Sequence, residues 1–306
     1  MTPLAAARRT LRPLKRAVRH WTDDPAGLAR ALRRFNLTSS TTINGTRFNI
    51  PVMRGLGLKN RDIGEAWMVD LLQRLLRTTG SAGLIDVGVN IGQTLLKLKS
   101  IDNDARWIGF EPNPSCVALV HELIRVNAFE GCQLVPTALS DHTGVLPLIA
   151  SSEADDCASV VPELRPDRRP FREQLIAALV FDELALPLDG IGVVKIDVEG
   201  AERQVLDGMQ GFLRRQRPVV ICEVLHAHSQ ETLASCGRQN RAMVDLFARL
   251  DYRIFWLRKA AARVSELEPT EAFPDLVWSD ASWGACDYLV VPAEKADRMR
   301  AEFDGR

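Results

Sequence analysis

The chain has 306 residues, of which 46% are hydrophobic and 25% charged, an ordinary composition for one large or two small globular domains. The formal net charge is zero, but the first 50 residues hold ten Lys and Arg against two Asp, so the body is acidic, which argues against general nucleic-acid binding. The six cysteines show no metal-binding spacing and favour a reducing cytoplasm, and no apolar run is long enough to cross a membrane.

Residues 1–40 are predicted to form a basic amino-terminal arm in which apolar side chains are interleaved at helical spacing. One interpretation is a basic amphipathic segment that touches an anionic membrane or a partner, and the other is a solvated, partly helical arm. The arm lacks the apolar stretch of a secretory signal. We therefore expect a cytoplasmic protein, membrane-peripheral under the first interpretation.

Residues 41–80 are predicted to flank the core as a hairpin and a helix. Asn44-Gly45 is a typical hairpin turn and lies between two extended segments. Residues 62–77 follow with apolar side chains at helical spacing, and Gly80 is placed to end that helix.

Strands and helices alternate from residue 81 to residue 295. Strands are predicted at 84–87, 106–111, 133–139, 145–150, 192–198, 219–224, 252–257 and 287–291. Helices are predicted at 93–99, 114–127, 172–184, directly after residue 200 and at 239–250, with a linker at 151–175 and a carboxy-terminal tail at 296–306. This order predicts an α/β, Rossmann-like fold with a mostly parallel, seven-stranded sheet and helices on both faces.

The segment from Asp86 to Gln93 has the pattern of a buried strand, a tight turn and a helix start. Gly88 and Gly92 lack a Cβ, so the backbone can turn sharply and a ligand can approach closely. The following helix would direct free N–H groups toward that ligand. A nicotinamide fingerprint needs a third glycine where this chain has Gln93. An acidic residue before the turn, here Asp86, is instead the pattern of S-adenosylmethionine sites.

A second strand is predicted to end at Glu111, 23 residues after Gly88. An ionised carboxylate at this place can accept hydrogen bonds from both ribose hydroxyls of an adenosine. Together the two segments predict a site for S-adenosylmethionine. The alternative is a structural glycine turn beside a surface glutamate.

Four motifs resemble the FkbM family of S-adenosylmethionine-dependent methyltransferases. They are IDVGVNIG at 85–92, FEPN at 110–113, ALSD at 138–141 and VKIDVEGAE at 194–202. The resemblance runs from residue 81 to 225 and continues more weakly to residue 292. It implies a class I methyltransferase fold and O-methylation of a hydroxyl, commonly on a sugar or a secondary metabolite.

The residues expected to hold the cofactor come from these motifs. Asp86 and the glycine turn should hold the methionine end and Glu111 the ribose. The resemblance implies that Ser140-Asp141 meets the adenine, although Asp141 could instead only form a turn. The full set is Asp86, Gly88, Asn90, Gly92, Gln93, Glu111, Pro112, Asn113, Ser140 and Asp141.

Three residues are candidates for taking the proton that an acceptor hydroxyl loses. Asp197 and Glu199 follow one strand at the expected cleft, and His226 follows the next. Other interpretations are a helix-dipole role for Glu199, a structural His226, and a divalent metal held by Asp197 and Glu223, although no metal is expected. Arginines at 165, 168, 169 and 172 could clamp an acceptor anion or form a solvated basic loop.

Two other functions stay open on the sequence alone. An NAD-dependent oxidoreductase is disfavoured by the missing third glycine. A catalytically inactive, methyltransferase-like binding module is disfavoured by the intact Asp86, Glu111 and Asp197. The expected partner is a small-molecule or glycan acceptor and not a nucleic acid, and the oligomeric state stays open.

Overall fold

The computed structural model describes residues 37–62, 64–150, 160, 172–279, 282 and 284–304. The predictions for most of the basic arm, for most of the 151–175 linker and for the arginines at 165, 168 and 169 therefore lie outside the described residues. No helix in these described ranges combines the length and the apolar character needed to span a bilayer.

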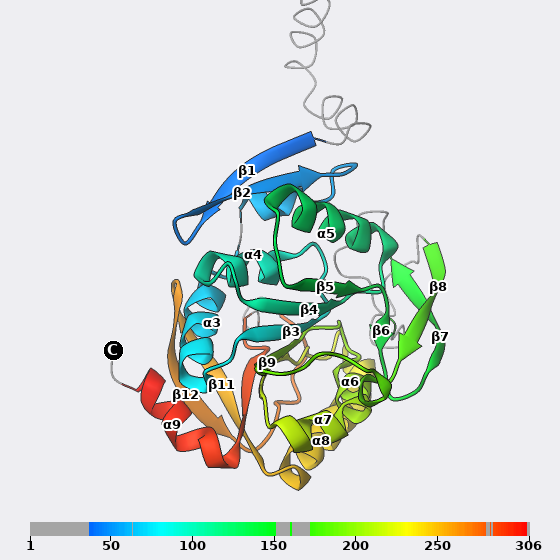
Figure 1. Ribbon diagram of the computed structural model, residues 1–306. Helices are drawn as coiled ribbons and strands as arrows, with labels where there is room; N and C mark the ends of the chain where they lie inside the picture. Colours follow the sequence, from blue (N-terminus) through cyan, green and yellow to red (C-terminus); the bar gives the residue numbers. More distant parts are fainter. Residues whose placement is uncertain are drawn as a thin grey trace, which may run out of the picture.

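The strands alternate with helices through most of the chain (Figure 1). The strands are β1 (Leu37–Ile43), β2 (Thr46–Val52), β3 (Gly83–Val87), β4 (Arg106–Phe110), β5 (Cys132–Val135), β6 (Ala138–Leu139), β7 (Gly144–Ala150), β8 (Arg172–Leu179), β9 (Ile191–Ile196), β10 (Val219–Glu223), β11 (Tyr252–Ala260), β12 (Arg263–Thr270) and β13 (Asp287–Pro292). The helices are α3 (Ala66–Thr79), α4 (Gln93–Ile101), α5 (Pro114–Asn127), α6 (Glu202–Gly208), α7 (Gln210–Gln216), α8 (Gln230–Arg249) and α9 (Ala293–Phe303), with 3₁₀ turns η1 (Leu58–Arg61) and η3 (Phe181–Glu183).

The central sheet has the order β12-β11-β13-β10-β9-β3-β4-β5. The strands from β10 to β5 run parallel, whereas β13, β11 and β12 are antiparallel. The chain winds outward from β3 through β4 to β5 and then returns to β9 on the other side of β3. Ligands bind at the carboxyl ends of the strands beside such a reversal. The Rossmann-like class I methyltransferase fold is thus confirmed, with eight strands rather than seven because β12 adds an edge.

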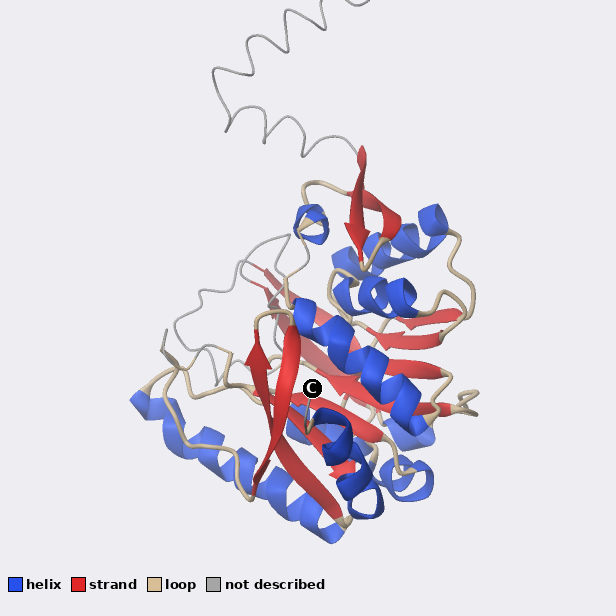
Figure 2. Cartoon of the chain, turned by 90° about the vertical axis from the view of Figure 1, so that its left-hand side faces the viewer, coloured by secondary structure: helices blue, strands red, loops and turns tan. Residues whose placement is uncertain are grey.

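Side chains along each central strand alternate between two apolar layers. In β3, Leu84 belongs to the cluster formed with α3, α4, α5 and α9, and Ile85 to the cluster formed with α6, α7 and α8. Val193 and Val194 divide in the same way in β9. Figure 2 shows helices on both sides of the sheet, as the sequence predicted.

The predicted hairpin is confirmed as β1 and β2, joined by Asn44 and Gly45 with φ of 47° and 79°. Two positive φ values in succession give a turn whose twist matches that of the strands. The hairpin packs on the body through Phe48, whose ring meets that of Phe129 edge-on at 5.7 Å between centroids. Gly80 ends α3 with φ of 66°, as predicted.

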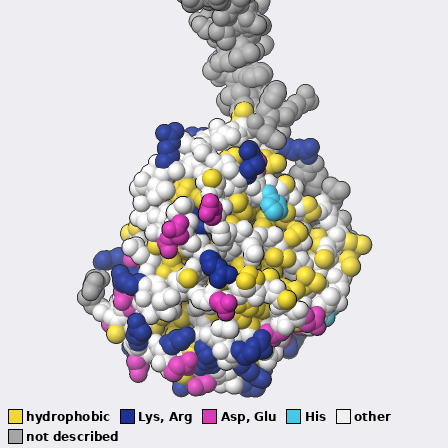
Figure 3. All heavy atoms as spheres, viewed as in Figure 1, with side chains coloured by type: hydrophobic (Ala, Val, Ile, Leu, Met, Phe, Trp, Pro, Cys, Tyr) yellow, Lys and Arg dark blue, Asp and Glu magenta, His cyan; other side chains and the backbone are white. Residues whose placement is uncertain are grey.

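The predicted helix at 172–184 is wrong, because residues Arg172–Leu179 form strand β8, followed by η3. Strand β8 pairs with β7 and β6 in a separate three-stranded sheet. Ile176 is buried, whereas Leu175 is 75% exposed, so the burial has period two although the apolar residues look helical in sequence. Figure 3, drawn in the view of Figure 1, shows many apolar side chains at the centre and right of the face that is turned toward the viewer.

Other boundaries also differ from the prediction. The strand expected at 133–139 is divided into β5 and β6 around Pro136, which has no N–H for a sheet. Helix α8 begins nine residues earlier than expected, at Gln230, where the Ser229 N–H donates to Thr232 Oγ1 at 3.1 Å. Residues 296–306, expected as a tail, include most of α9, whose Met299 and Phe303 are buried in the core.

Candidate active site

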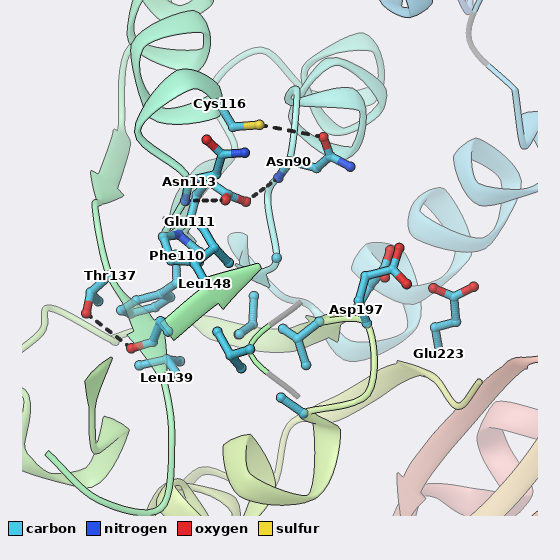
Figure 4. A pocket seen from close by; sticks show the side chains of 18 residues that line it. Asn90, Phe110, Glu111, Asn113, Cys116, Thr137, Leu139, Leu148, Asp197 and Glu223 are labelled. Carbon is cyan, nitrogen blue, oxygen red and sulfur yellow. Dashed lines mark hydrogen bonds between the residues drawn. The ribbon is translucent and has the colours of Figure 1, made fainter. Parts of the chain in front are cut away.

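The carboxyl ends of β3, β4 and β9 surround a cavity of about 250 Å³, called here the first cavity. Figure 4 shows apolar Phe110 and Leu139 at one end and the carboxyl groups of Asp197 and Glu223 at the other. The described residues that line it are Val87, Gly88, Asn90, Phe110, Glu111, Pro112, Asn113, Cys116, Thr137, Ala138, Leu139, Leu148, Val160, Asp197, Val198, Glu199, Ala201 and Glu223. An apolar end and a charged end suit a ligand with a flat ring and a polar tail.

The turn after β3 lies directly against the end of β9. Gly88 has φ of 84°, and a Cβ there would lie 1.8 Å from the carbonyl oxygen of Asp197. Only glycine therefore fits without moving β9. Asn90 is also left-handed, with φ of 55°. Non-glycine residues in this region cluster at functional sites, and here the conformation accompanies a backbone N–H that points at Glu111 (Figure 4).

Glu111 is 6% exposed and lines the first cavity. Its two oxygens accept hydrogen bonds of 2.7 Å each, one from the N–H of Asn90 and one from the N–H of Asn113. The Asn113 side chain caps α5 by accepting from the N–H of Ser115 at 3.0 Å. The carboxylate is thus fixed by the turn after β3 and by the start of α5. Each oxygen retains a second acceptor site, which fits the two neighbouring hydroxyls of a ribose.

Burial raises the pKa of Glu111 to about 7, although the N–H groups of Asn113 and Asn90 oppose the shift. A ligand hydroxyl that donates to this carboxyl group favours its ionised form. Below about pH 7 the proton on Glu111 has to be released before such a ligand binds. Affinity for the ligand should therefore fall as the pH falls through this value.

We expect Glu111→Gln to weaken S-adenosylhomocysteine binding by about 1.5–3 kcal/mol, the range for hydrogen bonds to charged groups. The wild type should bind more tightly at about pH 8 than at about pH 6, and the variant should lose this dependence. Calorimetric titration at both pH values measures the effect. Glu130→Gln, which changes an exposed carboxylate, is the control. Unchanged affinity in Glu111→Gln would contradict the ribose role.

An array of opposite charges lies behind the turn. Lys195 is buried, with its Nζ 2.9 Å from Asp197 Oδ2 and 3.9 Å from Asp86 Oδ1. Asp86 is fully buried and accepts a 3.2 Å hydrogen bond from Trp107 Nε1. Burial raises the pKa of Asp86 to about 6. Burial also lowers the pKa of Lys195, but the charges of Asp197 and Asp86 outweigh it and hold the pKa above its usual value.

The carboxyl groups of Asp197 and Glu223 lie at the charged end of the first cavity (Figure 4), and each shifts the pKa of the other. Burial raises the pKa of Asp197, but Lys195 and Glu223 outweigh it, so the pKa lies below its usual value. The charge of Asp197, followed by burial, raises the pKa of Glu223 well above its usual range. Of the two carboxyl groups, Asp197 is therefore the stronger acid and Glu223 the one that is protonated first. An ionised Asp197 that is already held by Lys195 is a weak proton acceptor.

A second cavity, of about 510 Å³, adjoins the first and shares Glu199 and Glu223 with it. Glu199 has φ of 56°, a strained conformation that places its side chain on both walls. The described residues that line the second cavity are Glu65, Trp67, Glu199, Gly200, Glu202, Glu223, Val224, Leu225, His226, His228, Cys236, Gln239, Asn240, Met243, Lys259, Trp278, Gly284, Cys286 and Asp287. Two adjoining cavities suit a donor and an acceptor that must meet.

His226 lies on the wall of the second cavity and is 7% exposed. Its Nε2 is buried and has no hydrogen-bond partner among the described residues. Burial lowers the pKa of His226, although a hydrogen bond to the Ser282 backbone opposes the shift. The ring is therefore neutral near pH 7. With Nδ1 left for Ser282, a lone pair on Nε2 can accept a proton.

The structure brings about half of the predicted cofactor residues to the first cavity. Gly88, Asn90, Glu111, Pro112 and Asn113 line it. The described wall does not include Asp86, Gly92, Gln93, Ser140 or Asp141. Of the predicted catalytic residues, Asp197 lines the first cavity, His226 the second, and Glu199 both.

The predicted residues away from the wall have other roles. Asp86 supports the turn through Lys195, and Gly92 precedes α4 as a left-handed cap. Ser140 donates to Asp141 at 3.1 Å, and Asp141 also binds the His142 ring at 2.7 Å, away from the described wall. His142, followed by Ser140, lowers the pKa of Asp141, although burial opposes the shift.

The sequence did not indicate several residues of the first cavity. Thr137 and Leu148 come from segments that leave the main sheet, and no motif marks them. Cys116 lies on the first turn of α5, and its Sγ approaches Asn90 Oδ1 at 3.9 Å (Figure 4). Its helical position after Asn113 is the one signal that could have placed it beside Glu111.

The chain matches known methyltransferases. The FkbM methyltransferase domain matches residues 86–254, which is more than half of the chain. The curated methyltransferase sdnD of Sordaria araneosa is 26% identical over 154 residues, covering 41% of this chain and 60% of the relative. The chain thus spans less than two thirds of that relative.

Two solved structures are similar at low identity. The methyltransferase FkbM of Methylobacillus flagellatus KT is 16% identical, with 69% of this chain and 43% of that chain covered and a TM-score of 0.42. The tRNA (uracil-54, C5)-methyltransferase of Pyrococcus abyssi, solved with S-adenosyl-L-homocysteine, is 13% identical, with 83% and 43% covered and a TM-score of 0.39. The strand order of the central sheet identifies the fold independently of these two structures. By its domain match, the chain belongs to the FkbM family of methyltransferases, whose cofactor is S-adenosylmethionine.

Proposed function

We propose that this chain transfers a methyl group from S-adenosylmethionine to a hydroxyl of a small molecule, either a sugar or glycan or a secondary metabolite. The observation that carries the proposal is the pair of adjoining cavities that share Glu199 and Glu223. The first fits an adenosine through Glu111 and its apolar end. The second has a neutral histidine for an acceptor that must lose a proton. Family membership supports the same reaction class.

The residues of the first cavity would hold the cofactor, which supplies an already activated methyl group when bound. Glu111 would bind the ribose, and the turn from Gly88 to Asn90 would lie along the methionine portion of the cofactor. The chain's own task is then to orient the acceptor and to receive its proton. Asp86 would have an indirect role, because its carboxyl group helps to hold the positive charge of Lys195 behind the turn.

We assign proton acceptance to His226 in preference to Asp197 and Glu199. Asp197 is already paired with Lys195 at 2.9 Å and its pKa lies below its usual value, which makes it a weak base. Glu199 lies on both walls, so we assign it to positioning at the junction. The Nε2 of His226 has no partner in the described part of the chain, so its lone pair is available to a hydroxyl that reaches it. The three roles are separable by mutation.

Labelled methyl transfer tests the reaction type. The protein is incubated with S-adenosylmethionine labelled in its methyl group and with a panel of sugars and polyhydroxylated metabolites. A methyl ether product survives mild alkali, whereas a methyl ester is hydrolysed. We expect an alkali-stable product that requires the acceptor hydroxyl. Alkali-labile label, or label on nitrogen, would contradict O-methylation.

The proposal extends to a cytoplasmic location with membrane contact through the basic arm. The ten basic and two acidic residues among the first 50 support this. Deleting residues 1–36 should reduce co-sedimentation with anionic vesicles, as should added salt, and should leave S-adenosylhomocysteine affinity unchanged. Neutral vesicles serve as the control. Equal co-sedimentation with and without the arm would remove the membrane role.

A further inference from the structure

The charge of the second cavity differs from that of an ordinary polar pocket. Its described wall carries five carboxyl groups, from Glu65, Glu199, Glu202, Glu223 and Asp287, and a single lysine, Lys259. No arginine lines its described part. Carboxyl groups therefore outnumber cationic side chains on this part of the wall.

Part of this acidic charge is offset within the protein. Lys259 pairs with Asp287. Glu65 Oε2 lies 2.9 Å from the Nζ of Lys97, which is 1% exposed behind the wall. Glu202 is different, because its Oε1 accepts a 2.9 Å hydrogen bond from the N–H of Gly200, a neutral donor. Burial raises the pKa of Glu202 to about 7, which is the response of a carboxyl group that lacks a neighbouring cation.

Among the described residues, no three His, Cys, Asp or Glu side chains converge as metal ligands would. Glu65 is held by Lys97 and Glu202 by the turn at Gly200, so they are anchored apart. A spread of carboxylates around a chamber fits an organic cation better than a small ion.

Two further side chains point to a polyhydroxylated ligand. His226 is 7% exposed, lines the cavity and carries an Nε2 without a partner in the described ranges, so a hydroxyl there would complete its hydrogen bonding. Trp278 lies on the same wall and is 43% exposed. An exposed indole at a polar cavity is suited to the C–H face of a pyranose ring.

Resting on the methyl transfer proposed above, we infer that the acceptor is a sugar that carries a protonated amine. The hydroxyl to be methylated lies toward His226 and the junction formed by Glu199 and Glu223. The ammonium group lies toward Glu202 and Glu199, where the protein supplies carboxyl groups and little positive charge. Uronic acids and phosphorylated sugars are disfavoured because their own negative charge would be repelled by the carboxyl groups of the second cavity.

A matched panel of methyl glycosides tests this inference. The methyl glycosides of glucosamine, N-acetylglucosamine and glucuronic acid keep the pyranose ring and differ in charge. Each is assayed with labelled S-adenosylmethionine near pH 7, and kcat/KM is compared. We expect the amine to exceed the acetamide about tenfold, the difference between a charged and a neutral hydrogen bond. The uronate should be the poorest acceptor.

The ratio of kcat/KM for amine over acetamide separates recognition from chemistry, because a lost catalytic group lowers both values together. Glu199→Gln should bring the ratio toward one, and Glu266→Gln, on the exposed face of β12, should leave it unchanged. A wild-type ratio near one, or a uronate as good as the amine, would overturn the inference. So would a panel left unmethylated by protein that binds S-adenosylhomocysteine. Failure to bind S-adenosylhomocysteine would instead remove the proposed function.

Discussion

His226→Asn should lower turnover by about 10²–10⁴-fold, the usual contribution of a general base. The asparagine amide can still form the hydrogen bond to the Ser282 backbone. It cannot take a proton from the hydroxyl of the substrate, as Nε2 of His226 can. Affinity for S-adenosylhomocysteine should be unchanged, because His226 lines only the second cavity. Turnover at saturating cofactor and calorimetric binding, measured on the same preparation, check both statements.

The pH profile identifies the base more specifically than the loss of activity does. Burial lowers the pKa of His226, so wild-type kcat should rise with pH through a value below about 6.5 and then level off. His226→Asn should lose this rise, and His228→Asn, a change on the same cavity wall, should keep it. If the rise persists in His226→Asn and disappears in Asp197→Asn, the base is Asp197.

Lys195→Met should lower the free energy of unfolding by about 3–5 kcal/mol, the effect of removing one partner from a buried ion pair. Asp86 and Asp197 would lose the cation that lies 3.9 Å and 2.9 Å from them. Their pKa values in the folded variant would rise, so the folded state would bind protons more readily than the unfolded state. The loss should therefore be larger at about pH 8 than at about pH 5. Urea denaturation at both pH values measures it.

A double variant and a remote lysine control the Lys195 result. Adding Asp86→Asn should recover part of the stability, because the amide can still accept from Trp107 without a buried charge. Lys295→Met removes one hydrogen bond from Lys295 to the Arg217 carbonyl on the far side of the molecule. It should cost only about 0.5–1.5 kcal/mol. Equal losses in Lys195→Met and Lys295→Met would show that the array behind the turn contributes little.

The sequence predicted the parts of the fold that depend on local pattern. The turn after β3 could be placed because Gly88 is required by contact with the end of β9, and such a glycine is visible in a sequence. The helix α5 was predicted with its correct bounds because Asn113 and Pro114 form a local start signal. The two N–H groups that donate to Glu111, those of Asn90 and Asn113, belong to this turn and to the start of α5.

Features that depend on tertiary partners were not predictable in the same way. Strand β8 looks helical in sequence because Leu175, Ile176 and Leu179 recur at helical spacing, and only pairing with β7 makes it a strand. The raised pKa of Glu223 depends on Asp197, 26 residues earlier in the sequence. The second cavity gathers side chains from α3, α8, β11 and the segments around β13, so no single motif marks it.

Calorimetric titration of the protein with S-adenosylhomocysteine and, separately, with NAD shows which of the two ligands the first cavity binds. The first cavity is assigned to an adenosine whose ribose is held by Glu111, beside a turn that lacks the third glycine of a dinucleotide site. We predict saturable binding of S-adenosylhomocysteine that weakens in Glu111→Gln, and no binding of NAD. Binding of NAD without binding of S-adenosylhomocysteine would contradict the assignment of the first cavity to S-adenosylmethionine.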